Sequence, residues 1–287
     1  MTEIVSNQPS LYVVATPIGN LGDMSNRAVD VLESVDLIAA EDTRHSAKLL
    51  QNFGIDTPML SCHDFSSHAR QAEIVEKLQQ GLSVALISDA GTPTVADPGY
   101  ELVNLARSAG IAVITVPGPS SIIAALSISG IPSDRFVFEG FLPAKLIGRE
   151  KALSTALSST RTIIFLETPH RIVASLESIL KVLGPERSLF IGRELTKLFE
   201  ESFKGSVEEC LAWIKRDSNR QKGEFVLILS GLPKEQQKSL DEQEGRRVLD
   251  FLSPRLPVNE AVKLAAKISG ASRNGLYHYA MSKKSDE

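Results

Sequence analysis

The sequence predicts an α/β protein with two α/β domains and a small helical tail, and three patterns indicate this fold class. Short apolar runs recur along the chain of 287 residues, and loops of small or polar residues and helical stripes alternate with them. A Pro/Gly-rich stretch at 117–119 separates two series of such runs. After residue 232 only three short helical segments follow. The expected domains are therefore residues 1–117, 118–232 and 233–287.

The first domain is expected to hold strands over the apolar runs 11–15, 37–40, 59–61, 85–87 and 111–116. Helices are expected from about Ser25, over 46–53, over 68–80 and behind Asp97. Asp97 and Pro98 together are typical of a helix start, with Asp97 as the N-cap and proline in the first helical position. Gly110 marks the end of that helix.

The second domain is expected to have strands at 136–138, 162–166, 188–191 and 225–229, with a charged helix from Arg149. Three helices are expected in the tail, over 241–252, 258–269 and 272–283. Gly270 ends the second of them and Ser272 caps the third. Such an arrangement resembles a helix-turn-helix, although many small helical bundles share it.

Composition and charge narrow the function classes. Hydrophobic residues make up 43% and charged residues 23% of the chain, as in an ordinary soluble protein. Cys62 and Cys210 lie far apart without metal-ligand spacing, so neither a disulfide framework nor a metal site is expected. The first residues lack the apolar core of a signal peptide, and no run approaches the length of a membrane span. We expect a cytoplasmic protein that does not contact a membrane.

The charge is unevenly distributed. Residues 246–287 hold eight Lys/Arg and four Asp/Glu, a net charge of +4, whereas the rest of the chain carries −8. A basic tail can contact a phosphate backbone, but charge alone favours a solvated helical appendage somewhat more. The overall net charge of −4 does not by itself indicate a nucleic-acid binder.

The loops that follow the strands carry the candidate site. In the stretch 85–99 an apolar run is followed by small residues, among them Gly91, whose missing Cβ lets the backbone approach a ligand. An ordinary strand-to-helix turn is the alternative, and spacing alone favours it slightly. Ser120 and Ser121 at a helix start can bind a polar ligand group or serve as plain caps.

Polar residues also follow other strands, at 41–44, 167–171 and 193–197. Burying them is costly unless they face a cleft, so we expect one shared cleft between the two domains. The loop of His63, Asp64 and His68 invites a metal or acid–base interpretation, but no second ligand cluster supports a metal. Neither G-x-G-x-x-G after the first strand nor a P-loop motif is present, so a dinucleotide or P-loop site is not expected.

Five motifs together are far more specific than any single loop. They are Thr16–Leu21 (TPIGNL), Ala40–Arg44 (AEDTR), Ser88–Pro93 (SDAGTP), Pro169–Arg171 (PHR) and Arg193–Lys197 (RELTK). From about Leu11 to Met281 the chain closely resembles the bacterial 16S rRNA cytidine 2′-O-methyltransferases, a branch of the tetrapyrrole methylase superfamily. The resemblance implies S-adenosylmethionine as methyl donor, bound in the cleft between two α/β domains, and a homodimer. It also implies 16S rRNA of the small ribosomal subunit as substrate, at a decoding-centre cytidine, cytidine 1402.

The resemblance also implies residue roles. The cofactor contacts would be Pro17, Ala90, Gly91, Thr92, Val95, Ser120, Ser121, Leu166, Leu195 and Phe225, with the charge of Asp89 near the cationic part of the donor. One departure concerns the loop after His63 and Asp64. The family commonly continues it with a His-Asn-Glu-like run, whereas this chain reads Phe65-Ser66-Ser67, so a role of this loop in substrate handling is in doubt.

The implied chemistry is an in-line displacement on the sulfonium methyl by a ribose 2′-hydroxyl, which a positioned proton acceptor would accelerate by roughly 10²–10⁴-fold. The candidate acceptors, in order, are Asp42, Glu41, Glu167 and His63. The candidate RNA contacts are Arg44, Lys145, Arg149, His170, Arg171, Arg193 and Lys197. For each single basic residue, a surface salt bridge is the alternative role.

Three other functions are alternatives for this sequence. A tetrapyrrole methyltransferase of the same superfamily is the nearest, and the tail and the polar loops at 41–44 and 169–171 argue against it. A non-catalytic rRNA-binding assembly factor would have bulky residues in the donor loop, whereas Ala90, Gly91 and Thr92 leave it open. A nicotinamide oxidoreductase is disfavoured because its fingerprint is missing.

Overall fold

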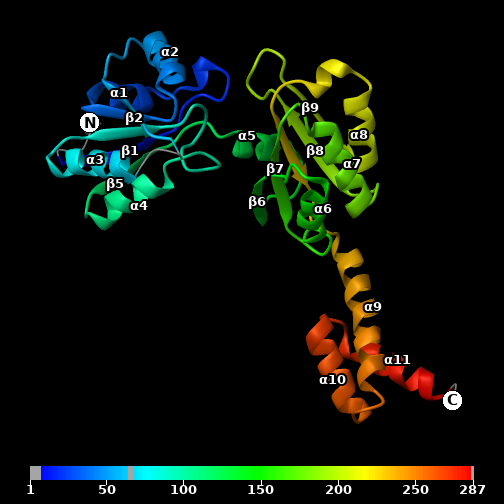
Figure 1. The fold of residues 1–287 in the computed structure, drawn as a ribbon. Helices are drawn as coiled ribbons and strands as arrows, with labels where there is room; N and C mark the ends of the chain where they lie inside the picture. Colours follow the sequence, from blue (N-terminus) through cyan, green and yellow to red (C-terminus); the bar gives the residue numbers. More distant parts are fainter. Residues whose placement is uncertain (1–7, 64–67, 286–287) are drawn as a thin grey trace.

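The computed structural model describes residues 8–63 and 68–285, which form two α/β units and a helical tail (Figure 1). Each unit is built on its own five-stranded sheet. The two sheets fall on either side of the stretch 117–120, in agreement with the expected division, and the residue boundaries of the domains remain predictions. No helix among the described residues is long and apolar enough to cross a membrane.

The N-terminal unit has a fully parallel sheet with the strand order β3-β2-β4-β1-β5. Its strands are β1 (Ser10–Val14), β2 (Leu37–Ala40), β3 (Met59–Ser61), β4 (Val84–Ile87) and β5 (Ala112–Val116). Its helices are α1 (Asn26–Ser34), α2 (Thr43–Phe53), α3 (His68–Gln79) and α4 (Tyr100–Ser108), with a 3₁₀ turn η1 (Leu21–Asp23).

Helices cover both faces of this sheet. One core joins α1 and α2 to Tyr12 and Ile87, and the other joins α3 and α4 to Leu11 and Leu86. Neighbouring residues of one strand therefore point to opposite cores, which explains why these strands are apolar throughout. Because all strands run the same way, the loops that follow them meet at one edge of the sheet.

Helix starts confirm some expectations and correct one. Ser25 caps α1 by accepting a hydrogen bond from the backbone N–H of Ala28, and Asp42 caps α2 through the N–H of Arg44. The expectation that Asp97 caps a helix with Pro98 in its first turn is wrong. The helix α4 begins at Tyr100 behind Gly99, whose φ of 121° is open to glycine, so Asp97 stays in the loop.

The C-terminal unit has a mixed sheet with the strand order β6-β7-β10-β8-β9. Its strands are β6 (Phe136–Phe141), β7 (Thr162–Glu167), β8 (Ser188–Arg193), β9 (Glu201–Ser206) and β10 (Phe225–Leu229). Its helices are α5 (Ser121–Ile128), α6 (Leu146–Ser154), α7 (Ile172–Leu183) and α8 (Val207–Lys215), with a 3₁₀ turn η2 (Ser218–Gln221). The core under α6, α7 and α8 lies on one face, and α5 packs on the other against Ile164 and Val226.

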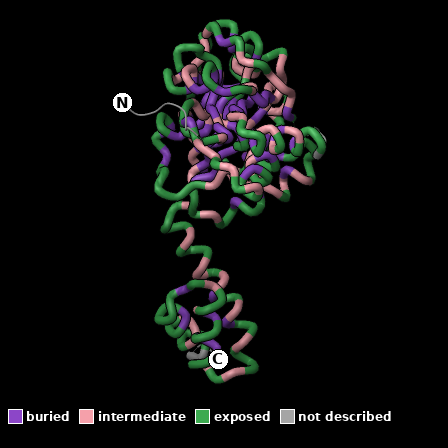
Figure 2. Tube along the Cα trace, turned by 90° about the vertical axis from the view of Figure 1, so that its left-hand side faces the viewer, coloured by how far each residue is buried: buried purple, intermediate pink, exposed green. Residues whose placement is uncertain are grey.

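The tail consists of α9 (Lys234–Leu252), α10 (Val258–Ser269) and α11 (Arg273–Ser285). Its three helices share a small core that includes Leu249, Val262 and Leu276. Gly245 lets α9 approach closely, since a Cβ there would come within 2.6 Å of the Cβ of Ala271. Figures 1 and 2 show that α9 carries this bundle away from the two sheets.

Candidate functional site

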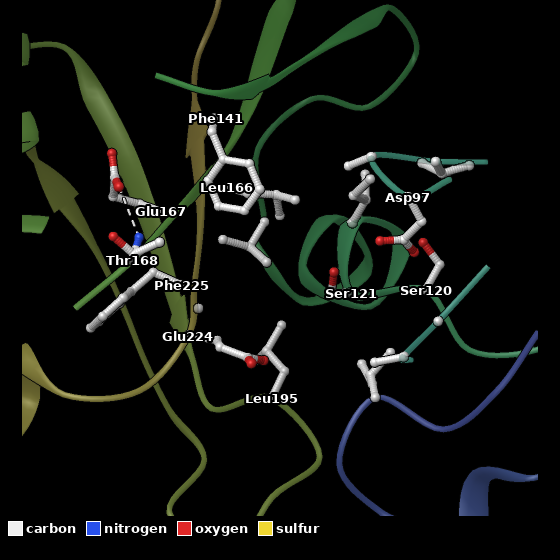
Figure 3. A pocket seen from close by; sticks show the side chains of 18 of the residues that line it. Asp97, Ser120, Ser121, Phe141, Leu166, Glu167, Thr168, Leu195, Glu224 and Phe225 are labelled. Atoms are coloured by element: carbon white, nitrogen blue, oxygen red, sulfur yellow. Dashed lines mark hydrogen bonds between the residues drawn. The ribbon is translucent and has the colours of Figure 1, made fainter. Parts of the chain in front are cut away.

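A cavity of about 290 Å³ lies between the two sheet units, and we call it the central cavity. Loops of the N-terminal unit form one wall and strand ends of the C-terminal unit form the other (Figure 3). Its lining residues are Ile18, Ala90, Gly91, Thr92, Val95, Ala96, Asp97, Ser120, Ser121, Ile122, Phe141, Leu166, Glu167, Thr168, Pro169, Gly192, Leu195, Glu224, Phe225 and Val226. Of the eleven residues expected at a cofactor, all but Pro17 and Asp89 are among them.

The N-terminal wall is fixed by backbone hydrogen bonds. Gly91 and Thr16 exchange two of them, at 3.0 Å and 2.8 Å, which ties the loop after β4 to the loop after β1. Gly91 has a φ of 85°, a conformation that side chains with a Cβ rarely adopt. The hydroxyl of Thr92 donates to the carbonyl of Pro119 at 3.0 Å and so holds the start of α5 in place.

Four non-glycine residues of the described chain have positive φ, and they fall in two loops that line this cavity. Thr94 and Ala96 lie in the loop after β4, and Glu194 and Thr196 lie in the loop after β8, with φ between 49° and 72°. Each such conformation costs of order 1–3 kcal/mol and persists where the surroundings enforce it, commonly at ligand sites. The two strained loops therefore mark this cavity as a candidate binding site.

Strand alternation decides which side chains reach the cavity from the C-terminal wall. Leu166 and Leu195 pack with α5 on the cavity side of the sheet. The ring of Phe225 belongs to the core under α6, α7 and α8, and the carboxylate of Glu167 points the same way. Phe225 and Glu167 line the cavity, but their side chains are directed toward the core under α6, α7 and α8, so the contact of Phe225 with a cofactor stays a prediction.

The side chains that line the central cavity are either neutral or acidic. Asp97 and Glu224 line it, as does Glu167, whose carboxylate points away toward Ser175, and no Lys, Arg or His lines it within the described residues. In Figure 3 Asp97 and Ser120 lie across the cavity from Leu166 and Thr168. This lining suits a ligand that is partly apolar and partly cationic, and it disfavours one that carries phosphates.

A second cavity, of about 320 Å³, adjoins the first, and we call it the α2 cavity. The two share Ile18, Ala90 and Glu224. The remaining lining is Pro17, Gly19, Leu21, His45, Lys48, Leu49, Asn52, Asp89 and Lys197. Three of these residues are basic, so the two adjoining cavities differ in charge.

Lys197 closes the α2 cavity from the C-terminal unit. Its ammonium group donates to Glu194 at 2.9 Å and to Glu224 at 3.0 Å. Partial burial acts to lower the pKa of Lys197, but the hydrogen bonds to the two carboxylates outweigh it and raise the pKa. Burial acts to raise the pKa of Glu194, and the bonds from Lys197 and from the N–H of Glu224 lower it on balance. The stem of Lys197 packs on Gly19, where a Cβ would come within 2.3 Å of it.

The candidate proton acceptors are not gathered at either cavity. Asp42 lines neither, and hydrogen bonds from the side chain and N–H of Arg44 hold its pKa well below the ordinary range, which makes it a poor base. The buried Glu167 accepts from Arg171 at 2.9 Å and from the hydroxyl of Ser175 at 2.6 Å, which is a structural arrangement. His63 lines neither cavity.

Glu41 uses its carboxylate to hold the backbone of Asp89. Its carboxylate accepts from the N–H of Asp89 at 3.2 Å, and the Asp89 carboxylate accepts from the N–H of Asp42 at 3.2 Å. These two bonds tie the loops after β2 and β4 together. The carboxylate that this arrangement places at a cavity wall is that of Asp89. The loop at 64–67, where the chain departs from the family's pattern, lies outside the described residues.

The candidate RNA contacts divide into two groups. Arg149 and Arg193 are buried and donate to internal acceptors, Arg149 to Ser178 and Ala144 and Arg193 to the carbonyls of Lys222 and Phe199. Both guanidinium groups hold loops in place, and the expectation that they face RNA is wrong.

The other candidates are more accessible. Arg44, Lys145 and His170 are exposed. Arg171 is partly exposed and paired with Glu167, and Lys197 is paired with Glu194 and Glu224. Arg44, Lys145 and His170 thus remain the accessible basic positions among those expected.

Several cavity residues escaped the sequence-based expectation. Ile18 and Glu224 line both cavities, and Asp97 and Phe141 line the central one. Ile18 lies within the motif Thr16–Leu21 and Glu224 directly precedes the strand β10, so their place at strand ends was a usable signal. Asp97 was assigned to a helix cap, and Phe141 lies in a longer strand than expected. Among the described residues no cluster of His, Cys, Asp and Glu could hold a metal ion.

Comparison with known families matches both parts of the chain. The family model of tetrapyrrole (corrin/porphyrin) methylases matches residues 10–211. A model of the RsmI C-terminal helix-turn-helix domain matches residues 239–284, which covers most of the tail. Among solved structures, uroporphyrin-III C-methyltransferase from Thermus thermophilus superposes with a TM-score of 0.56 at 20% identity, over 78% of this chain and 94% of that one. The expected fold class is confirmed.

Curated relatives cover nearly the whole length. Ribosomal RNA small subunit methyltransferase I of Escherichia coli O157:H7 is 50% identical over 276 residues, which is 96% of either chain. The protein of the same name from Synechocystis sp. is 46% identical over 96% of this chain and 99% of its own. The chain therefore belongs to the tetrapyrrole methylase family, in the branch of the ribosomal RNA small subunit methyltransferase I proteins.

Proposed function

We propose that this methyltransferase transfers the methyl group of S-adenosylmethionine to the ribose 2′-hydroxyl of a decoding-centre cytidine, cytidine 1402, in 16S rRNA. The observation that carries the proposal is 50% identity, over 96% of both chains, to a protein named ribosomal RNA small subunit methyltransferase I. The match of the tail to the RsmI C-terminal helix-turn-helix domain agrees with it. The ribose oxygen and the cytidine are the finer parts of the proposal and rest on the resemblance.

The central cavity fits the proposed cofactor. S-adenosylmethionine is a cation with an adenosine part, and the cavity offers an apolar wall together with the carboxylates of Asp97 and Glu224. A structural relative, uroporphyrin-III C-methyltransferase complexed with S-adenosyl homocysteine, has the same fold with a TM-score of 0.52. The loop at 90–92, the hydroxyls of Ser120 and Ser121, and the side chains of Leu166 and Leu195 would hold the cofactor. When bound, it supplies an electrophilic methyl group on a sulfonium sulfur.

The protein's own contribution is positioning of the reactants. The hydrogen bonds of Gly91 with Thr16 and of Thr92 with Pro119 fix the N-terminal wall before any ligand arrives. Holding two reactants in line in this way lowers a barrier by up to about 7–11 kcal/mol. A positioned proton acceptor contributes a further 10²–10⁴-fold, roughly.

The proposed substrate also implies partners and a location. The expected partner is 16S rRNA within the small ribosomal subunit, and the expected compartment is the cytoplasm, where that subunit is made. A homodimer is expected from the resemblance. Exposed apolar side chains of Ile123, Ile128 and Phe136 on α5 and β6 are compatible with such an interface.

A binding and transfer experiment tests the proposal. Calorimetry measures binding of S-adenosylmethionine, and labelled cofactor is then incubated with small ribosomal subunits from a strain that lacks the enzyme. Binding together with label in 16S rRNA is the expected result. Binding without transfer to any RNA would favour a tetrapyrrole substrate. Absence of binding would favour a non-catalytic assembly factor.

A further inference from the structure

We propose that the α2 cavity is the pocket for the acceptor nucleotide, with Asp89 as the proton acceptor and Lys48 as a contact to a phosphate of the RNA. This inference rests on the proposed function. It differs from the role that the resemblance implies for Asp89, which is a contact to the cofactor.

The α2 cavity adjoins the central cavity. A displacement at carbon needs the attacking oxygen and the leaving sulfur on opposite sides of the methyl group, so the two reactants must occupy neighbouring spaces that open into each other. The α2 cavity shares Ile18, Ala90 and Glu224 with the central cavity. With the cofactor in the central cavity, the α2 cavity is an adjoining space from which an acceptor can approach the methyl group.

The charged residues that line the two cavities differ. The charged residues at the central cavity are all acidic, whereas the α2 cavity has His45, Lys48 and Lys197 beside the acidic Asp89 and Glu224. The charge of Lys197 is offset by Glu194 and Glu224. Lys48 makes no ion pair or side-chain hydrogen bond in the described part of the chain, and its residue is exposed. A cationic donor would thus meet the acidic central cavity, and a phosphate of the acceptor would find Lys48 at the α2 cavity.

The placement of Asp89 also supports the proposal. Oδ1 of its carboxylate accepts from the N–H of Asp42, and its own N–H is bound by the carboxylate of Glu41. No hydrogen bond to Oδ2 occurs within residues 8–63 and 68–285. The next residue, Ala90, belongs to the wall that both cavities share. The loop after β2 therefore holds Asp89 through Oδ1 and through its N–H, and Oδ2 has no hydrogen bond to the described residues around Asp89 at the α2 cavity.

These positions define the methyl-transfer step. The 2′-oxygen of the ribose forms a bond to the methyl carbon with one of its lone pairs, while the carbon–sulfur bond breaks and its electron pair goes to sulfur. The hydroxyl proton passes to Oδ2 of Asp89 and is later released to water. Lys48 holds a phosphate of the same or the adjoining nucleotide and so fixes the ribose over Asp89.

Two variants with matched controls test the assignment on the full-length protein, with small ribosomal subunits lacking the modification as substrate. Asp89→Asn keeps the acceptor for the N–H of Asp42, so it preserves the loops and removes the base. We expect its single-turnover transfer rate to fall roughly 10²–10⁴-fold with the affinity for S-adenosylmethionine changed less than threefold.

Lys48→Ala is expected to raise the KM for subunits about tenfold and to lower the slope of log affinity against log salt by about 1. Lys48→Arg should restore both. The control is Lys77→Ala, because Lys77 lies on α3 across the sheet from α2 and should leave KM and slope unchanged.

The outcomes separate this inference from the proposed function. Failure of the unmodified protein to methylate subunits overturns the proposed function itself. If the unmodified protein is active and Asp89→Asn transfers methyl at the same rate, or loses cofactor affinity instead of rate, the assignment of Asp89 is overturned. If Lys48→Ala behaves like Lys77→Ala, the α2 cavity does not hold the RNA.

Discussion

Replacing Gly91 by leucine should abolish cofactor binding while the fold persists. An ideal Cβ at this position would lie 3.4 Å from Cγ2 of Ile18 and 3.8 Å from the carbonyl oxygen of Pro119, so the Cβ itself fits. The rest of the leucine side chain must occupy the central cavity, which Gly91 and Ile18 both line. The φ of 85° adds strain of about 1–2 kcal/mol in the free protein.

The assay is thermal unfolding with and without S-adenosylmethionine. At a ligand concentration of 100 Kd, binding stabilises a protein by about 2.7 kcal/mol, which corresponds to a rise in Tm of roughly 5–10 °C. We expect this rise in the unmodified protein and none in Gly91→Leu. The control is Gly110→Leu, because Gly110 has a φ of 75°, open space around its Cβ position and no place in either cavity.

The two variants separate strain from blockage. Both should lower the Tm of the free protein to a similar extent, and Gly110→Leu should keep the full rise on adding cofactor. A rise of unmodified size in Gly91→Leu would refute the placement of the cofactor in the central cavity. Loss of the rise in both variants would mean that backbone strain alone explains the effect.

Three further predictions concern groups that the structure gives a structural role. Glu167→Gln should lower the free energy of unfolding by about 2–4 kcal/mol in denaturant titrations, because the buried carboxylate holds Arg171 and Ser175, and cofactor affinity should change less than threefold. Arg149→Ala should lower the free energy of unfolding by about 2–3 kcal/mol in the same assay, because the buried guanidinium donates a hydrogen bond to Ser178. It should leave the salt dependence of RNA binding unchanged, and a changed salt slope would show that Arg149 contacts RNA. Burial raises the pKa of the Cys210 thiol from 9.0 to about 12. The stability that this thiol contributes is therefore full below pH 9 and is lost as the pH rises toward 12. At pH 8 an aromatic disulfide reagent should leave the buried thiol of Cys210 unmodified in the native protein and react with it once the chain is unfolded.

Much of the fold could be predicted because local signals and tertiary packing agree. The run 37–40 is a strand with the expected bounds, and Gly270 ends α10 in a left-handed conformation as expected. The expected helix at 241–252 begins earlier, at Lys234. Residues 234–240 are mostly polar on all sides, so no apolar stripe marks them as helical.

The cavity could be predicted in part, because parallel strands bring their following loops to one edge. Gly91 and Ser120 reach the central cavity for that reason. Which side chains at the strand ends face the cavity could not be predicted. Leu166 and Glu167 are neighbours on β7 and must point to opposite faces, so only one of them can present its side chain to the cavity. Which face borders the cavity depends on how the second unit docks, and that is a tertiary property.

Charge in the sequence did not distinguish surface cations from buried ones. Arg193 is the last residue of β8 and begins a motif of polar residues, yet its guanidinium donates to carbonyls of Lys222 and Phe199 inside the unit. A guanidinium group satisfies several backbone carbonyls at once, and this use leaves no trace in local sequence. Lys48, in contrast, stands mid-helix without a motif and attracts notice only once the α2 cavity is seen.

The atom that receives the methyl group is the most direct test of the account. RNA from small subunits labelled by the purified protein is digested to nucleosides and analysed by mass spectrometry with fragmentation of the glycosidic bond. We expect the label in a cytidine, with the added methyl mass on the ribose fragment. Label on the base fragment, or in a nucleoside other than cytidine, would contradict it.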